Sequence, residues 1–91
     1  MVEQYEVGDS FTENDVAAVH SMTIIDVSAG EYTLAEEWVN ADGKSVWVEY
    51  EIPERGLTAR IDQGKCEPAG SVSESRFQTV MEHIERARQR T

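Results

Sequence analysis

The sequence predicts one α+β domain over residues 1–91, a four- to five-stranded antiparallel β-meander with one C-terminal amphipathic helix packed on its apolar face. Three observations predict it. Apolar and polar residues alternate between residues 21 and 62, turn residues interrupt them about every ten positions, and apolar residues after residue 71 follow a helical spacing. With 91 residues and 40% apolar content, the chain suits one hydrophobic core, and no linker divides it.

The middle hairpin carries the clearest turn signal. Between Asn40 and Lys44, Ala-Asp-Gly suits a three-residue loop in which Gly43 takes the left-handed conformation of a bulge. That loop length sets the strand register. One face then carries Trp38 with Val46, Glu36 with Val48, Leu34 with Tyr50, and Tyr32 with Ile52. The other carries Val39 with Ser45, Glu37 with Trp47, Ala35 with Glu49, and Thr33 with Glu51.

The adjoining hairpins extend the apolar face. A two-residue turn at Ala29-Gly30 adds a strand to it, through the pairs Val27 with Tyr32 and Ile25 with Leu34. A four-residue turn from Pro53 to Gly56 predicts a further strand. Its pairs are Ile52 with Leu57, Tyr50 with Ala59, and Val48 with Ile61. Because three separate turns produce one consistent face, they support each other.

The two ends of the chain complete the prediction. Residues 2–7 predict another short strand, whereas residues 12–19 fit either a short helix or an extension of the next strand back to Val16. Residues 63–70, with two glycines and a proline, predict a loop. Residues 71–74 form a capping-box pattern that opens a helix of about four turns. Its apolar stripe consists of Phe77, Val80, Met81, Ile84 and Ala87.

Charge is the most unusual feature of the composition. Eighteen acidic residues against eight basic ones give a formal net charge of −10, and only Lys44 and Lys65 are lysines. Such a surface repels nucleic acid and anionic membranes. It indicates adaptation to a salt-rich cytoplasm; the alternatives are a DNA mimic that inhibits a nucleic-acid-binding protein, and ordinary acidic solubility. Arg86, Arg88 and Arg90 predict a solvated helix end rather than a nucleic-acid contact.

Catalytic, cofactor and metal motifs are missing from the sequence. It contains no HExxH, CxxC, GxSxG or glycine-rich phosphate loop, so we predict no enzyme, cofactor or metal site. His20 and His83 are expected at the surface or its boundary, and the single Cys66 is expected to be structural or incidental, in a reducing compartment. No secretory signal or membrane-length stretch is visible, and we expect a cytoplasmic protein.

Glu36 is the first candidate functional residue. The predicted register places it on the apolar face of a central strand, between Leu34 and Trp38. If it is buried there, its carboxylate is a candidate for ligand binding or acid-base chemistry, in a pocket shared with Trp38 at the open end of the layer between sheet and helix. The alternative is a solvated carboxylate paired with an arginine.

Trp47 is the second candidate, because it lies on the otherwise polar face. Val39, Met22 and Ile24 are expected near it, and this patch predicts contact with a protein partner or with a second copy as a homodimer. The alternative is a second small core beneath the N-terminal strand. Glu49 and Arg60 are expected to form a cross-strand pair on this face.

These features predict a non-enzymatic protein-interaction or regulatory domain that works through Trp47 in a salt-rich cytoplasm. A small-ligand-binding domain with a pocket at Glu36 and Trp38 is the second hypothesis, and a DNA mimic is the third.

Overall fold

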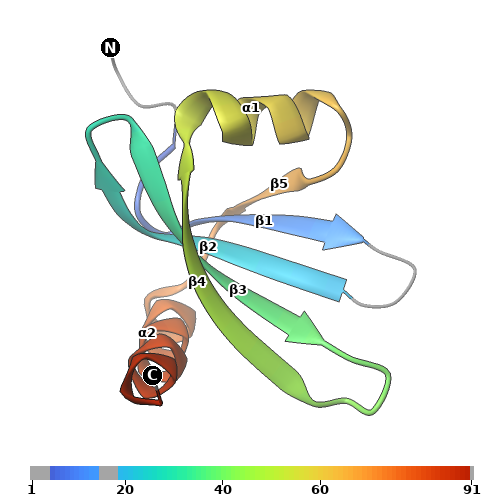
Figure 1. The fold of residues 1–91 in the computed structure, drawn as a ribbon, viewed down its shortest axis with the longest axis vertical. Helices are drawn as coiled ribbons and strands as arrows, with labels where there is room; N and C mark the ends of the chain where they lie inside the picture. The colour runs from blue at the N-terminus through green and yellow to red at the C-terminus, as the bar shows by residue number, and fades with distance from the viewer. Residues whose placement is uncertain (1–4, 15–18, 91) are drawn as a thin grey trace.

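The computed structural model, which describes residues 5–14 and 19–90, has an α+β fold with a five-stranded antiparallel sheet (Figure 1). The order of strands across the sheet is β4-β3-β2-β1-β5. A C-terminal helix is present, as predicted, together with a second helix. The elements are β1 (Asp9–Asn14), β2 (Val19–Ser28), β3 (Glu31–Val39), β4 (Ser45–Pro53), α1 (Glu54–Asp62), β5 (Glu67–Ser71) and α2 (Glu74–Gln89).

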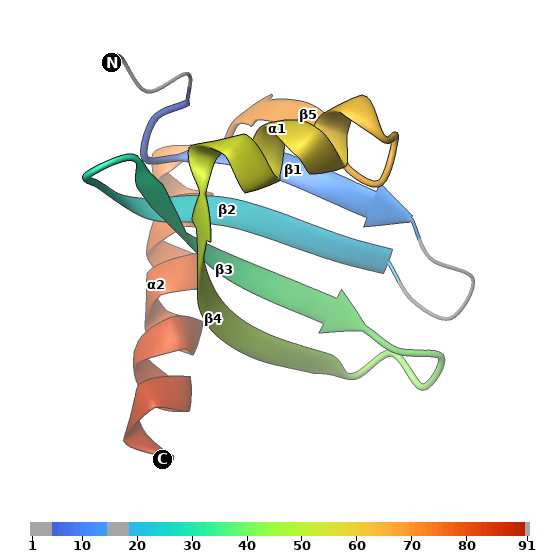
Figure 2. The same ribbon diagram turned by 45° about the horizontal axis from the view of Figure 1, so that its top comes forward.

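The two helices lie on opposite sides of the sheet (Figures 1 and 2). The first hydrophobic cluster lies on the α1 side and contains Phe11, Met22, Ile24, Tyr32, Leu34, Ile52, Leu57 and Cys66. The second lies on the α2 side and contains Ala35, Val80 and Ile84, with Ile25 and Trp47 packed against it. The prediction that the C-terminal helix covers the apolar face is therefore wrong. Because α1 occupies that face, α2 covers the one with Trp47.

Residues 57–61 form part of α1, so the strand predicted there is wrong. Leu57 and Ile61 fit both a two-residue and a 3.6-residue period, since they are four positions apart. Pro53 precedes the helix with φ −68°, and Glu54 lies in its first turn, where an acidic side chain suits the helix dipole. A first helical turn and an isolated type I turn share backbone angles near the α region, so the sequence signals for the two are alike.

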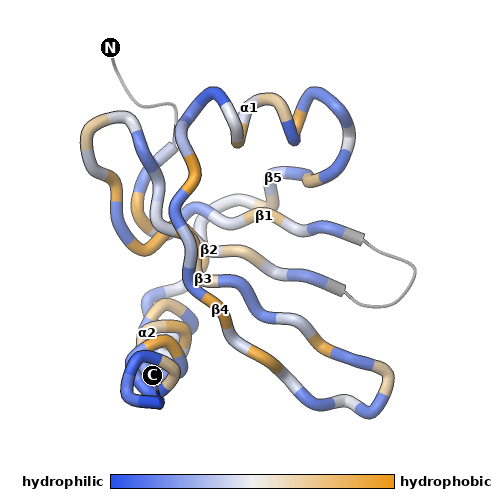
Figure 3. The backbone as a smooth tube through the Cα atoms, in the orientation of Figure 1, coloured by the Kyte–Doolittle hydropathy of each residue, from blue (hydrophilic) through white to orange (hydrophobic). Residues whose placement is uncertain are grey.

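The register of β3 and β4 is confirmed at every predicted pair, from Tyr32 with Ile52 to Val39 with Ser45. The connecting loop also has the predicted form. The Asn40 amide donates to the Lys44 carbonyl over 3.0 Å, and Gly43 has φ +78°. The Asn40 side chain accepts from the amides of Asp42 and Lys44, which holds the loop closed. Orange and blue segments alternate along β4, as this two-sided pairing requires (Figure 3).

A β-bulge in β2 changes the predicted pairing of β2 with β3. Val27 pairs with Tyr32 as predicted, but the register shifts between Ile24 and Asp26, so that Ile24 and not Ile25 pairs with Leu34. One extra residue in a strand moves the side chains beyond it, counted from the turn at Ala29-Gly30, to the opposite face from the one predicted. Met22 and Ile24 therefore lie wholly buried in the first cluster, and their predicted place beside Trp47 is wrong.

The chain ends also differ from the prediction. Of the strand predicted at residues 2–7, the described residues 5–7 are not in a strand, and β1 begins at Asp9. Of the undecided residues 12–19, residues 12–14 belong to β1, Val19 begins β2, and residues 15–18 lie outside the described residues. Residues 67–70 of the predicted loop at 63–70 belong to β5, which pairs with β1. All five β5 residues are exposed, so no apolar pattern marks this strand.

Replacing Ala29 by asparagine is expected to stabilise the fold by about 0.5 to 1 kcal/mol. Ala29 and Gly30 have φ +50° and +79°, the positive values of a type I′ turn, and asparagine tolerates them better than alanine. Urea denaturation measures the effect. The matched control is Ala41→Asn, because Ala41 lies in a hairpin loop at a position without positive φ. Equal midpoints for both variants and the parent chain would contradict the strain at Ala29.

Candidate functional site

Glu36 is buried in β3, with 6% of its surface exposed, and hydrogen-bond donors surround its carboxylate. His20 Nδ1 lies 3.0 Å from Oε2, and the indole nitrogen of Trp38 donates to the same oxygen. The Tyr50 hydroxyl donates to Oε1 over 2.9 Å. Burial of a carboxylate is costly unless such partners replace water. The site is therefore a hydrogen-bonded cluster around a buried carboxylate.

Arg60 connects this cluster to α1. Its Nη1 donates to the Tyr50 hydroxyl over 3.3 Å, and its guanidinium carbon lies 5.8 Å from the centre of the Tyr50 ring. Burial, and then the charge of Glu36, raise the pKa of Tyr50 above its ordinary value. The hydroxyl thus keeps its proton and remains a donor. Within the described chain, no ion pair joins Arg60 to a carboxylate.

The bulge in β2 brings His20 into the cluster. In the shifted register His20 pairs with Trp38 and Met22 pairs with Glu36, so both side chains lie on the same face as Glu36. The ring centres of His20 and Trp38 are 4.8 Å apart. Only 8% of His20 is exposed, which differs from its predicted place at the surface or boundary. Bulges commonly redirect side chains next to functional sites, and this one supplies His20, one of the three side chains that bond Glu36.

An open pocket of about 350 Å³ lies over this cluster. Trp38, which is 43% exposed, and Val48 contribute apolar surface to it. The lining residues are Glu13, His20, Glu36, Trp38, Val48, Tyr50 and Arg60, and we call this the Glu36 pocket. Glu36 and Trp38 were predicted to share a pocket, and the structure brings them together. The prediction that this pocket lies between the sheet and the C-terminal helix is wrong, because α2 covers the other face and Arg60 of α1 lines the pocket. Tyr50 was within reach of sequence reasoning, because the predicted register sets it diagonally across from Glu36.

Trp47 lies beneath α2 and is partly buried. Its ring stacks on the His83 ring with centres 4.7 Å apart. The guanidinium carbon of Arg76 lies 5.6 Å from the centre of the Trp47 ring. Among the described residues its indole nitrogen has no hydrogen-bond partner. Of the residues predicted to form an interaction patch with it, Val39 is exposed, whereas Met22 and Ile24 are buried on the other side of the sheet.

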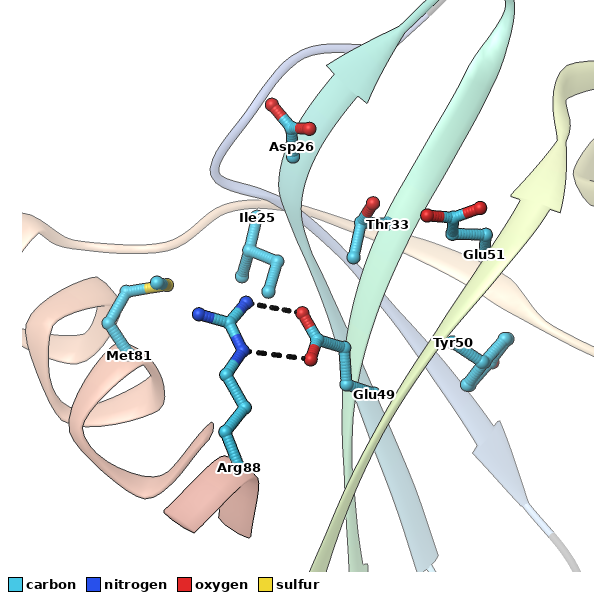
Figure 4. Close-up of a pocket in the computed structure, with 8 residues that line it drawn as sticks. All are labelled: Ile25, Asp26, Thr33, Glu49, Tyr50, Glu51, Met81 and Arg88. Carbon is cyan, nitrogen blue, oxygen red and sulfur yellow. Dashed lines mark hydrogen bonds and ion pairs between the residues drawn. The ribbon is translucent and has the colours of Figure 1, made fainter. Parts of the chain in front are cut away.

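A second cleft, of about 640 Å³, lies between part of α2 and the sheet (Figure 4). Arg88 from α2 reaches Glu49 from β4 and bonds both of its oxygens. These bonds hold the pKa of Glu49 below its ordinary value. The predicted pair of Glu49 with Arg60 is therefore wrong, because Arg60 lies in α1 on the opposite face. In Figure 4, Asp26 and Glu51 lie apart from the Arg88–Glu49 pair.

Other candidate chemistry is limited in the described residues. Cys66 is buried in the first cluster, and burial raises the pKa of its thiol, which disfavours the reactive thiolate. Three or more metal-ligating side chains do not converge anywhere in residues 5–14 and 19–90. Over the same residues, neither α1 nor α2 has the length and apolar character needed to cross a bilayer.

Replacing Arg76 by glutamine is expected to destabilise the domain by less than about 1 kcal/mol at pH 7. Burial raises the pKa of Glu37, but hydrogen bonds from Ser45 and Arg76 outweigh it and hold this pKa below its ordinary value. A lowered pKa stabilises the fold above the unfolded-state pKa, and the effect disappears as the pH falls through the folded-state pKa. Urea midpoints of the variant and the parent chain should thus converge as the pH falls below the lowered pKa of Glu37. Arg55→Gln is the control, and an Arg76→Gln difference that persists at low pH would contradict this role.

Comparisons with known proteins give no relative from which a function could be inferred, so a function is inferred from the geometry of the site alone. No protein-family model, curated protein or solved structure matches this chain.

Proposed function

We propose that this chain is a non-enzymatic binding domain that takes a small ligand in the Glu36 pocket. The observation that carries the proposal is the convergence of polar side chains from β2, β3 and β4 on a buried carboxylate, directly beside an exposed tryptophan, with Arg60 of α1 bonded to one of these side chains. Pockets that combine apolar surface with a few oriented polar groups are typical ligand sites. Both oxygens of Glu36 already accept hydrogen bonds, which favours a positioning role over proton transfer.

The charges at this pocket favour a ligand without net charge. Glu13 and Arg60 both line it, and no ion pair joins them in the described chain. A free anion is repelled by the net charge of −10, whereas a zwitterion is not. We therefore propose a small zwitterion with an apolar part, whose ammonium meets Glu13, whose carboxylate meets Arg60, and whose apolar part lies on Trp38.

Tryptophan fluorescence tests this proposal. The chain contains two tryptophans, so Trp47→Phe leaves Trp38 as the only one. The probes share a phenyl ring and differ in charge: L-phenylalanine carries both charges, 3-phenylpropionate the carboxylate, phenethylamine the ammonium, and benzyl alcohol neither. We expect a saturable change in Trp38 emission, with phenylalanine binding about tenfold more tightly than either singly charged probe, which corresponds to about 1.4 kcal/mol.

Two matched variants separate the charges. Arg60→Gln should remove the advantage of phenylalanine over phenethylamine, and Glu13→Gln should remove its advantage over 3-phenylpropionate. No saturable change with any of the four probes would overturn the ligand-binding proposal. Saturable binding with equal affinity for all four would overturn the zwitterion assignment and retain the pocket.

A protein-interaction domain, as predicted from the sequence, is the second candidate function. The observation that favours it is a group of exposed apolar side chains on one face of β3 and β4, namely Trp38, Val46 and Val48. With Trp47 under α2, this group replaces the predicted Trp47 patch as the surface offered to a partner.

We also propose that the acidic surface is an adaptation to a salt-rich cytoplasm. Raising KCl from 0.1 to 1 M shortens the Debye length from about 10 Å to about 3 Å, which screens the repulsion among the excess carboxylates. The urea midpoint at pH 7 should therefore rise with salt. Near pH 4.4, the isoelectric point, where the net charge is close to zero, the salt effect should largely disappear. A midpoint at pH 7 that is unchanged or lower in 1 M KCl would contradict the adaptation.

A further inference from the structure

The outer edge of β4 is open. β4 is the terminal strand of the sheet and pairs only with β3 among the described strands. In an antiparallel ladder the pairs alternate between hydrogen-bonded and non-hydrogen-bonded, and the Asn40–Lys44 pair at the loop is hydrogen-bonded. Counting on from it, the peptide groups of Ser45, Trp47, Glu49 and Glu51 point away from β3. They are free to pair with an added strand.

Nothing in β4 blocks such pairing before its end. Exposed edges are commonly protected by lysine, proline or a bulge. From Ser45 to Ile52, β4 contains no lysine and no proline, and its pairing with β3 shows no register shift. Pro53 ends the accessible segment. Val46 is 50% exposed and Val48 is also exposed, so an added strand would find apolar neighbours on the Glu36 side.

The C-terminal turns of α2 extend past β4 (Figure 2), and a groove lies between these turns and the strand. Two pockets of about 350 and 340 Å³ lie between β4 and these turns. Trp47 and Ala87 line both of them. A strand added to β4 would therefore lie over α2, with one set of side chains against the helix and the other set beside Val46 and Val48.

This groove is basic in a strongly acidic protein. Arg86, Arg88 and Arg90 line it, which are three of the eight basic residues of the chain, and Lys44 directly precedes β4. Arg88 bonds Glu49 and neutralises that carboxylate. Arg86 and Arg90 make no ion pair with a described carboxylate. The local charge thus complements a negatively charged guest.

From these observations we infer that the β4 edge binds an extended acidic segment of a partner protein, which adds to the sheet as a sixth strand. Side chains alternate across a strand, so the segment alternates acidic and apolar residues. Its carboxylates face Arg86 and Arg90 over α2, and its apolar side chains continue the surface of Val46 and Val48. A second copy of this chain fits less well, because a two-fold axis near the middle of β4 would bring the basic ends of two α2 helices together.

Fluorescence polarisation with defined peptides tests the inference. The probe is a heptapeptide of alternating glutamate and valine with fluorescein on its N-terminus and an amidated C-terminus, measured at low ionic strength against the full chain. Two control peptides match it: one with lysine for glutamate, and one with the same sequence but alternate peptide nitrogens methylated, which blocks strand pairing. We expect saturable binding of the probe alone, and at least tenfold weaker binding by the Arg86→Gln/Arg90→Gln variant.

Further measurements make the outcome decisive. Arg55→Gln/Lys65→Gln removes the same number of charges elsewhere and should retain binding. Equal binding of the methylated peptide would show plain charge attraction and overturn strand addition. No saturable binding up to 1 mM, or equal binding of the lysine peptide, would overturn the acidic partner. A dimer in light scattering that the probe dissociates would assign the edge to a second copy and overturn the inference.

Discussion

Replacing Phe11 by alanine is expected to lower the free energy of unfolding by about 3 to 5 kcal/mol. Phe11 in β1 is wholly buried in the first cluster, and its ring meets Tyr5 edge to face with centres 5.0 Å apart. The substitution removes most of this side chain and leaves a cavity that neighbouring strands cannot fill. Because small domains are stable by about 5 to 15 kcal/mol, the loss would bring this one close to unfolding. Urea denaturation followed by circular dichroism measures it.

The matched control for Phe11 is Val7→Ala. Val7 is half exposed and lies just before β1, so its truncation should change stability by less than about 0.5 kcal/mol. A loss below about 1 kcal/mol for Phe11→Ala would mean that β1 is not part of the core, and the assigned order of the sheet would have to be revised.

Replacing Glu36 by glutamine is expected to cost about 1 to 3 kcal/mol, although the two side chains have nearly the same shape. The carboxylate accepts hydrogen bonds at both oxygens. An amide offers one oxygen and two N–H groups, so it cannot accept the bonds of His20 and Trp38 at one position and also accept the bond of Tyr50 at the other. Denaturation in urea at pH 7 measures the loss, and Trp38 emission should shift because its indole loses or changes its partner.

Glu37→Gln is the control, because the neighbouring residue points to the opposite face and pairs with Arg76 near the surface. Its neutralisation should cost less than about 1 kcal/mol. If both glutamines prove equally mild, the carboxylate of Glu36 is not the centre of a buried cluster, and the case for the Glu36 pocket fails with it.

Local turn chemistry explains what the sequence predicted correctly. The loops at Ala29-Gly30 and Asn40–Lys44 have strict backbone requirements. Gly30, Asn40 and Gly43 are residue types that meet these requirements, so the β3–β4 register and the position of Glu36 on its face can be predicted. α2 was also foreseen, although its N-cap is Ser73, whose side chain accepts from the Arg76 amide, rather than Ser71.

The errors occur where the sequence carries no local signal. The bulge at Ile25 involves neither glycine nor proline, yet it decides whether His20 or Ser21 faces Glu36. The side of the sheet that each helix covers depends on both helices. Because the sequence predicted a strand in place of α1, it placed the C-terminal helix on the wrong side. Arg60 reaches Tyr50 only because α1 folds back over the sheet. The sequence therefore predicted two residues of the Glu36 pocket, Glu36 and Trp38. His20 and Arg60 reach it only through the bulge and through the placement of α1.

The pairing of β1 with β5 has a consequence for the order of folding. Asp9 lies opposite Ser71, so β1 gains one neighbour from a short connection and the other only after some sixty further residues have been made. Closing so long a loop is slow compared with forming a hairpin. The hairpins around β3 are thus expected to form early and β5 to dock late, with β1 an exposed edge in the meantime. During synthesis this interval is when the chain is most open to mispairing with other nascent strands.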